Sequence, residues 1–188
     1  MTDSASMGTY MKILGELENV AGKIDESLLQ GMIAKIQDAN RIFCVGAGRS
    51  GIVLSAFCMR LNHLGLQAFM AGGIPCPGAG KGDLLVAASS SGKTPGIVAV
   101  LAQGKSAGAR IVAFTTTEEG GRNLGADLPL IIPAPSALVN TDNRVSVQSM
   151  KSLFEQTVFL LCETIVCVLK ERMAVSDVDM AARHANLE

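Results

Sequence analysis

The chain has 188 residues and a formal net charge of −1 at pH 7, with 48% hydrophobic and 18% charged residues. This length is typical of one domain with a sizeable core, so residues 1–188 are expected to form a single domain. A charge so close to zero, without a basic cluster, excludes a nucleic-acid-binding surface or an electrostatic membrane surface. So few charges on so apolar a chain favour self-association.

Cysteine usage and hydropathy favour a cytoplasmic protein. The cysteines are odd in number and lie mostly in apolar runs, which is typical of buried, reduced thiols rather than of disulfides or a metal site (Cys44, Cys58, Cys76, Cys162 and Cys167). The N-terminus is polar and lacks the apolar stretch of a signal peptide. The most apolar run, Val158 to Leu169, has 12 residues and contains Glu163, so it is too short and too charged to span a bilayer.

Hydrophobic periodicity predicts alternating strands and helices along the chain. A disordered leader is expected over about residues 1–8, and helical spacing follows over 9–40 with a break between Gly22 and Asp25. Short apolar runs predict strands at 41–45, 67–70, 84–88, 110–115 and 128–132. Helices are predicted at 50–64, 94–107, near 120–125 and at about 145–172, with a short helical tail from Ser176. This order indicates an α/β fold, a three-layer α-β-α sandwich around a parallel sheet.

Ligands of such folds bind beyond the carboxyl ends of the strands, which here points to the loops 46–51, 71–82 and 89–94. The first of them, in "RIFCVGAGRSG" (41–51), has the G-x-G-x-x-G pattern of a dinucleotide site. A NAD site also requires an acid about 20 residues further on, but "LQAFMAGGIPCPG" (66–78) contains none. The glycines therefore predict a tight turn that approaches a smaller ligand.

The loop at 89–94, "SSSGKT", ends like a Walker A motif but lacks its first glycine, because Ala87 stands at that position. Three serine hydroxyls, Thr94 and the free amides of a helix that starts at Pro95 suit a single phosphate monoester. Taken alone, the loop could also be a serine-rich turn with a helix cap.

Two loops of this kind carry a resemblance. A strand followed by "GAGRS" and another followed by "SSSGKT" resemble the SIS (sugar isomerase) domain, which binds phosphosugars on a five-stranded parallel sheet of flavodoxin-like order. The segment "QSMKSLFEQ" (148–156) and the tail "AARHANLE" (181–188) are similar to those of the 6-phospho-3-hexuloisomerases. The similarity runs from about Met11 to the end of the chain, and the tail is its more specific part.

The resemblance implies an isomerase that converts D-arabino-hex-3-ulose 6-phosphate to D-fructose 6-phosphate, the step after formaldehyde fixation in the ribulose monophosphate pathway. It implies a homo-oligomer, with a tetramer favoured, in which tail residues can complete a neighbour's site. It implies no cofactor, and enediol chemistry of this type needs no metal.

The reaction needs a base that carries a proton through a cis-enediol. Gln148, Ser152 and Glu155 have i, i+4, i+7 spacing, so they would form one polar stripe on the predicted helix at 145–172. A surface glutamate is the alternative for Glu155 from the residues alone. The resemblance places the catalytic glutamate on the corresponding helix, so Glu155 is predicted as the base, with Gln148 and Ser152 binding substrate.

Phosphate and sugar binding is predicted at the two loops. Arg49 could reach the phosphate or a sugar hydroxyl, while Lys93 is expected to be solvated. The full predicted binding set is Gly48, Arg49, Ser50, Ser89, Ser90, Ser91, Thr94, Gln148 and Ser152.

Two histidines could move a proton between the substrate oxygens. His63 ends a predicted helix, where a capping or packing role is expected. His184, in the polar tail, is the predicted second catalytic residue. It would assist proton transfer between the oxygens in the forward direction and ring opening in the reverse direction.

Two further readings compete with the isomerase. A sugar-phosphate sensor would use the same loops without a buried carboxylate, and an arabinose 5-phosphate isomerase usually has further regulatory domains. Glu155 discriminates against the first, and the chain length against the second.

Overall fold

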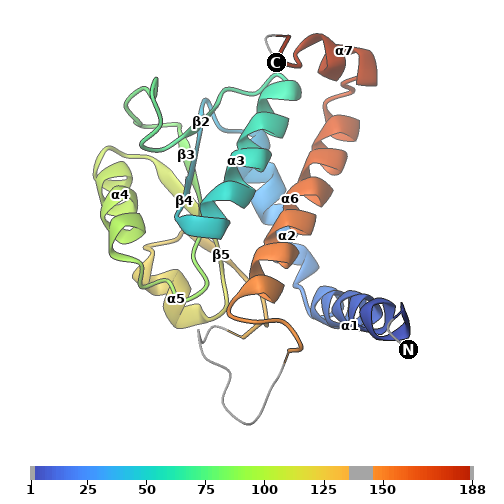
Figure 1. The fold of residues 1–188 in the computed structure, drawn as a ribbon. Helices are drawn as coiled ribbons and strands as arrows, with labels where there is room; N and C mark the ends of the chain where they lie inside the picture. Colours follow the sequence, from blue (N-terminus) through green and yellow to red (C-terminus); the bar gives the residue numbers. More distant parts are fainter. Residues whose placement is uncertain (1–2, 136–145, 187–188) are drawn as a thin grey trace.

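The computed structural model describes residues 3–135 and 146–186, which form a parallel sheet covered by helices on both faces (Figure 1). In this described part the sheet has five parallel strands in the order β2-β1-β3-β4-β5. The strands are β1 (Ile42–Gly46), β2 (Ala68–Met70), β3 (Leu84–Ala88), β4 (Arg110–Thr115) and β5 (Leu128–Ile131). The predicted α/β class and the predicted strands are confirmed, with ends that differ by one residue at most.

The strand register separates the core into two layers. Cys44 pairs with Val86 and Val86 with Val112, so these three side chains form a row on one face of the sheet. Phe43, Leu85 and Ile111 form the adjacent row, which points to the opposite face because successive side chains of a strand alternate. All six are at most 3% exposed, which explains why the central strands β1, β3 and β4 are apolar runs.

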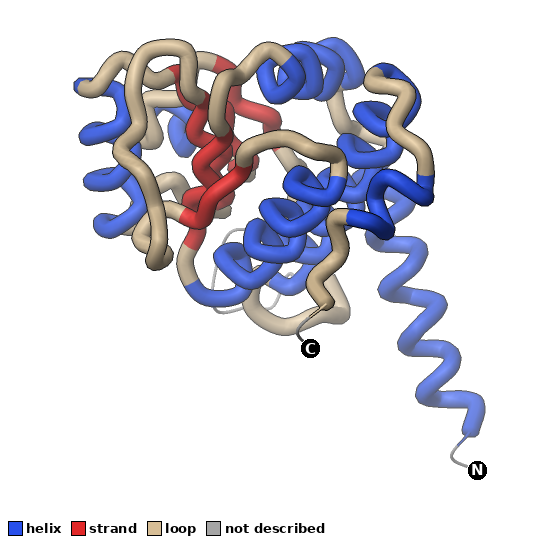
Figure 2. Tube along the Cα trace, turned by 90° about the horizontal axis from the view of Figure 1, so that it is seen from above, coloured by secondary structure: helices blue, strands red, loops and turns tan. Residues whose placement is uncertain are grey.

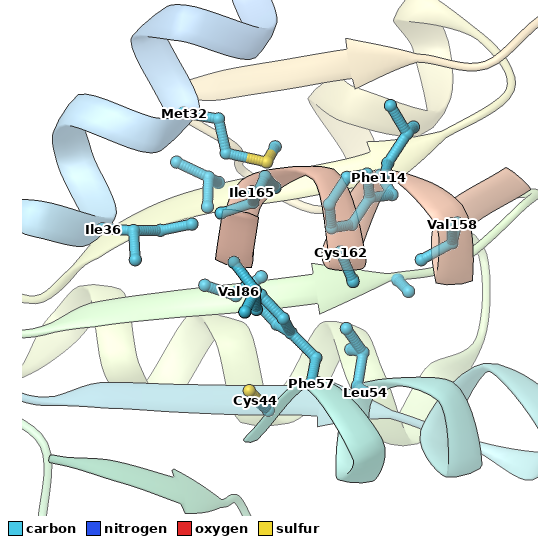
Figure 3. Packing of buried hydrophobic residues seen from close by; sticks show 14 of the residues in the cluster. Met32, Ile36, Cys44, Leu54, Phe57, Val86, Phe114, Val158, Cys162 and Ile165 are labelled. Atoms are coloured by element: carbon cyan, nitrogen blue, oxygen red, sulfur yellow. The ribbon is translucent and has the colours of Figure 1, made fainter. Parts of the chain in front are cut away.

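One face carries three helices: α2 (Glu26–Gln37), α3 (Gly48–His63) and α6 (Ser152–Arg172). Their buried side chains pack together with the Cys44 row, and Figure 3 shows Met32, Phe57 and Ile165 from the three helices converging on Val86 and Phe114. The other face is covered by α4 (Pro95–Ser106) and α5 (Glu118–Asn123), with Ile97 and Leu101 of α4 against the Phe43 row.

Helices α1 (Asp3–Ala21) and α7 (Asp177–Ala182) extend the sandwich at its two ends. The last turns of α1 pack on α6 through Leu17 and Val20, while its first part projects from the body (Figure 2). A disordered leader was expected over residues 1–8, but residues 3–8 are helical, since residues 3–7 contain no glycine or proline to interrupt the helix. The predicted break is confirmed, because Asp25 caps α2 by accepting from the amides of Ser27 and Leu28.

Helix α6 is apolar for a structural reason. It has 21 residues, and an 18-residue window within it has a mean hydropathy of 1.7, so it is long and apolar enough by composition to cross a membrane. Its inner side, from Leu153 and Phe154 to Leu169, is buried against the sheet core, which accounts for much of that apolarity.

Candidate active site

The turn between β1 and α3 is built by glycines. An added Cβ on Gly46 would lie 2.9 Å from the Cα of Gly51, so only glycine lets the end of the strand contact the start of the helix. Gly48 has φ +56°, a left-handed conformation that side chains disfavour. Ala47 precedes α3 and provides no side-chain cap, so the first amides of this 16-residue helix remain open to an anion.

The serine loop after β3 is fixed to the neighbouring strand. The carbonyl of Ser90 accepts from Thr115 Oγ1 at 3.1 Å and from Thr116 Oγ1 at 2.7 Å. Gly92, with φ +64°, lies so close to α5 that an added Cβ would be 2.3 Å from the carbonyl oxygen of Gly120. These contacts hold the loop in one conformation.

The hydroxyls of this loop are arranged for a ligand. Ser89 Oγ and Thr94 Oγ1 lie 3.4 Å apart, and Thr94 does not use its side chain to cap α4. Ser90 is 4% exposed, and its Oγ has no hydrogen-bond partner among the described residues. A buried hydroxyl without a partner is costly, which indicates that a ligand atom completes it. Ser91 Oγ instead accepts from the amide of Lys93 at 3.3 Å.

Glu155 lies in the first turn of α6 and faces the glycine turn. Its side chain is 13% exposed and forms an ion pair with Arg49 Nε, whose own side chain is 62% exposed. This pair connects the turn after β1 with the helix predicted to carry the base. Arg49 therefore contacts the carboxylate of Glu155 in this structure.

The two loops and α6 enclose one cavity of about 260 Å³. Its lining includes seven of the predicted site residues: Gly48, Arg49, Ser50, Ser89, Ser90, Thr94 and Glu155. Ser91, Gln148 and Ser152 do not line it. The third loop expected near the ligand, 71–82, contributes instead to an apolar cavity of about 300 Å³ on the α4 face, with Phe43, Cys76 and Gln103 in its wall.

The prediction that Gln148, Ser152 and Glu155 form one polar stripe on a helix is wrong, because α6 begins only at Ser152. Met150 has φ +57°, which interrupts a helix at that residue. Gln148 lies in the preceding segment and donates through Nε2 to Glu16 at 3.2 Å. Met150 and Lys151 line the cavity and were missed, since their role depends on where the helix starts.

His184 lies at the opposite end of α3 from this cavity. Its ring stacks on His63 with a centroid distance of 5.3 Å, and Arg183 Nη1 donates to the carbonyl of His63 at 3.0 Å. Since α3 has 16 residues, the two ends lie about 24 Å apart. Figure 1 shows α7 at that far end. The structure thus does not bring His184 to Glu155 of the same chain.

The remaining candidate side chains have structural contacts. Asp83, the acid that follows the glycine turn in sequence, is buried at the start of β3 and pairs with Arg41 at 2.6 Å, so it is unavailable to a ribose. Lys93 forms an exposed ion pair with Glu119 at 3.0 Å, which lowers the pKa of Glu119.

The thiols and the acids provide no metal centre in the described part of the chain. Cys44, Cys58 and Cys162 are buried as expected, while Cys167 is exposed. The hydrogen bond with Cys58 and burial raise the pKa of Cys44, and burial raises that of Cys162, so both are protonated at neutral pH. Among the residues that the structure describes, no three His, Cys, Asp or Glu side chains are grouped to hold a metal ion.

Comparison with known proteins identifies the family of the chain. A family model described as the SIS domain matches residues 35–161, more than half of the sequence. The chain therefore belongs to the SIS-domain family.

Within that family the chain is similar to the 3-hexulose-6-phosphate isomerases. It is 36% identical to the one from Mycobacterium gastri over the whole of both chains. It is 34% identical to the one from Bacillus subtilis, over 94% of this chain and 96% of that protein. A crystal structure of a Methanococcus jannaschii protein, inferred to be a 3-hexulose-6-phosphate isomerase, matches with a TM-score of 0.79 at 26% identity, covering 98% of this chain and 99% of that one. These relatives confirm the resemblance and the expected class, a phosphosugar isomerase.

Proposed function

We propose that the protein interconverts D-arabino-hex-3-ulose 6-phosphate and D-fructose 6-phosphate through a cis-enediol. The observation that carries this proposal is the cavity in which Glu155 faces two loops with open helix amides and serine hydroxyls. The activity of the named relatives supports the same substrate. The step would follow formaldehyde fixation in the ribulose monophosphate pathway, in the cytoplasm.

The phosphate would bind where α3 and α4 begin. Both helices are long enough to present a positive N-terminus, and neither is capped by a side chain. Ser50 and Thr94 stand at these starts, and Ser89 and Ser90 lie between them in the cavity wall. The phosphate would give Ser90 Oγ the partner it otherwise lacks.

Glu155 would act as the base. In the forward direction its carboxylate takes the proton from C2, the electron pair of the C–H bond forms the C2–C3 double bond, and the C3 ketone oxygen gains a proton to become an enediol hydroxyl. Glu155 then delivers its proton to C3, while the oxygen at C2 loses a proton and becomes the ketone, so that one proton has moved from the C2 oxygen to the C3 oxygen. Arg49 would hold the carboxylate in place and stabilise negative charge on the enediol oxygens.

The proton transfer between the two oxygens would use His184 of a neighbouring subunit. Within one chain His184 is stacked on His63, about 24 Å from the cavity end of α3. A homo-oligomer, in our proposal a tetramer, would bring a second tail to each site.

The surface offers a place for such an assembly. A second cavity of about 270 Å³ joins Arg49 and Glu155 to apolar side chains, among them Leu17, Val53 and Phe159. Leu160 of α6 also lines this cavity and is exposed, as are Tyr10, Met11 and Leu14 on α1. An apolar surface that begins at the catalytic carboxylate suits a second copy of the chain better than solvent.

A sugar-phosphate sensor is the alternative of another class, and an arabinose 5-phosphate isomerase is the alternative substrate assignment. A sensor would need the phosphate loops but not a shielded carboxylate at the same cavity. The position of Glu155 therefore favours the enzyme.

The test is to supply D-arabino-hex-3-ulose 6-phosphate and to follow D-fructose 6-phosphate through a coupled dehydrogenase. Glu155→Gln should lower kcat by about 10²- to 10⁴-fold, the usual contribution of a general base. Glu163→Gln is the matched control on the same helix, where the side chain contacts Arg60 at 3.7 Å. Absence of turnover by the wild-type protein, or an active Glu155→Gln variant, would refute the proposal.

A further inference from the structure

The carboxylate of Glu16 accepts three hydrogen bonds from the segment that precedes α6. Ser146 Oγ donates to its Oε2 at 2.8 Å, and Gln148 Nε2 donates to the same oxygen at 3.2 Å. The amide of Val147 donates to Oε1 at 2.5 Å. Glu16 is 130 residues from Ser146 in sequence, so α1 holds a segment near the far end of the chain.

This segment leads directly into the wall of the cavity. Ser146 and Gln148 are buried, and Ser146 Oγ also accepts from the Gln148 amide at 3.0 Å, which closes the turn. Two residues later Met150 adopts φ +57°, and then Met150 and Lys151 form part of the cavity lining. The carbonyl of Lys151 accepts from the amide of Glu155 at 3.1 Å.

The conformation of this segment requires support from outside. A positive φ is disfavoured for methionine, so the turn at Met150 persists only where surrounding contacts hold it. Charge-assisted hydrogen bonds are stronger than neutral ones, and Glu16 provides three acceptor contacts within three consecutive residues. The next residue of α1, Leu17, lines the second cavity, whose wall also includes Arg49 and Glu155.

We propose that Glu16 is a positioning residue of the isomerase site. It fixes residues 146–148, which sets the place where α6 starts and the position of Met150 and Lys151 opposite the phosphate loops. Glu16 itself does not line the cavity and touches no substrate. The inference rests on the proposed function, because its role is to place the wall against the sugar and the base at the reacting carbons.

The experiment compares Glu16→Gln with Glu18→Gln, an exposed acid on the same helix whose replacement changes the net charge equally. The glutamine side chain keeps one acceptor oxygen, but its NH₂ group is a donor and faces groups of residues 146–148 that also donate. We expect kcat/KM of Glu16→Gln to fall by about 10- to 100-fold, mainly through kcat, because small misplacements of reacting groups have effects of this size. The inhibition constant of inorganic phosphate, a probe of the two loops alone, should stay within about twofold of the wild type, since Glu16 does not contact those loops.

Ser146→Ala gives a second, milder variant that removes one of the three donors. It should lower kcat in the same direction, and the double variant should lose less than the product of the two single losses because both changes act on one contact.

The outcomes separate the two proposals. An active wild type with equal kcat/KM in Glu16→Gln and Glu18→Gln would overturn the role of Glu16 alone. A parallel loss of phosphate affinity and kcat in both Glu16→Gln and Ser146→Ala would show a general effect on folding and would also overturn it. A wild type without turnover would overturn the proposed function and this role together.

Discussion

Replacing Ser90 by alanine should stabilise the protein and weaken its function. The Ser90 hydroxyl is buried without a partner among the described residues, and leaving such a group unpaired costs about 1–3 kcal/mol. Ser90→Ala removes that cost while its carbonyl keeps the bonds from Thr115 and Thr116. At the low end, a gain of about 1 kcal/mol raises the unfolding temperature by about 2–4 °C for a chain of this size.

The effect on the ligand has the opposite sign. A hydrogen bond to a charged group contributes about 1.5–3 kcal/mol, so its loss should raise KM for the hexulose phosphate by about 10- to 100-fold. The phosphate should also protect the variant less against heat than it protects the wild type.

Thermal unfolding with and without D-fructose 6-phosphate, together with steady-state kinetics, measures both effects. Ser106→Ala, an exposed serine of α4, is the control that should change neither quantity. A Ser90→Ala protein that unfolds at a lower temperature and keeps its KM would refute the reasoning, because the hydroxyl would then be paired within the protein.

Two further predictions concern stability. Gly92→Ala should lower the free energy of unfolding by about 2 kcal/mol or more, because φ is +64° and the new Cβ would meet the carbonyl oxygen of Gly120 at 2.3 Å. Urea unfolding measures this loss, with Gly96→Ala as the control because a Cβ at Gly96 has no neighbour within 4 Å. Equal unfolding midpoints of the two variants would contradict the prediction. Burial, with His184 and Arg60 nearby, lowers the pKa of His63 below 6.5, so the folded state binds fewer protons than the unfolded state and stability should decline as the pH falls below about 6.5. Unfolding temperatures at pH 7.5 and 5.5 measure the decline; His63→Gln should make it smaller, and an unchanged slope in that variant would exclude His63 as its cause.

The sheet could be predicted from the sequence because its signal is local. The central strands β1, β3 and β4 are short apolar runs buried on both faces, so Val86 and Ala87 indicate a strand whichever helix covers them. The two loops could be predicted for the same reason, since Gly48 and Gly92 have the left-handed φ angles that glycine adopts most readily. The joint cavity then follows from β1 and β3 being neighbours in a parallel sheet.

The start of α6 could not be predicted because a distant contact decides it. Residues 146–151 contain no glycine or proline, so their composition is compatible with the helix that the spacing indicated. The three hydrogen bonds to Glu16 favour a different conformation there, and propensity yields to tertiary contacts of this kind. Because the helix starts later than predicted, Gln148 is not part of the predicted stripe, and Lys151 lines the cavity.

The helical state of residues 3–8 was missed for a related reason. A short polar terminus favours disorder, whereas here it continues a helix whose later turns are anchored on α6 through Leu17 and Val20. The place of His184 could not be read from the sequence either, because the tail follows α7 and its position depends on the contact of Arg183 with His63.

The cavity wall consists of main-chain turns at one part and of side chains at another, and this affects how related enzymes can diverge. The end assigned to the phosphate consists of main-chain turns and hydroxyls after β1 and β3, where the glycines leave little freedom for change. Another part of the wall comes from Met150 and Lys151, two residues that follow a segment held by α1. Substitutions at 150 and 151 can therefore alter which sugar is accepted without disturbing the recognition of its phosphate, so a library restricted to these two positions is the economical starting point for changing the substrate of this enzyme.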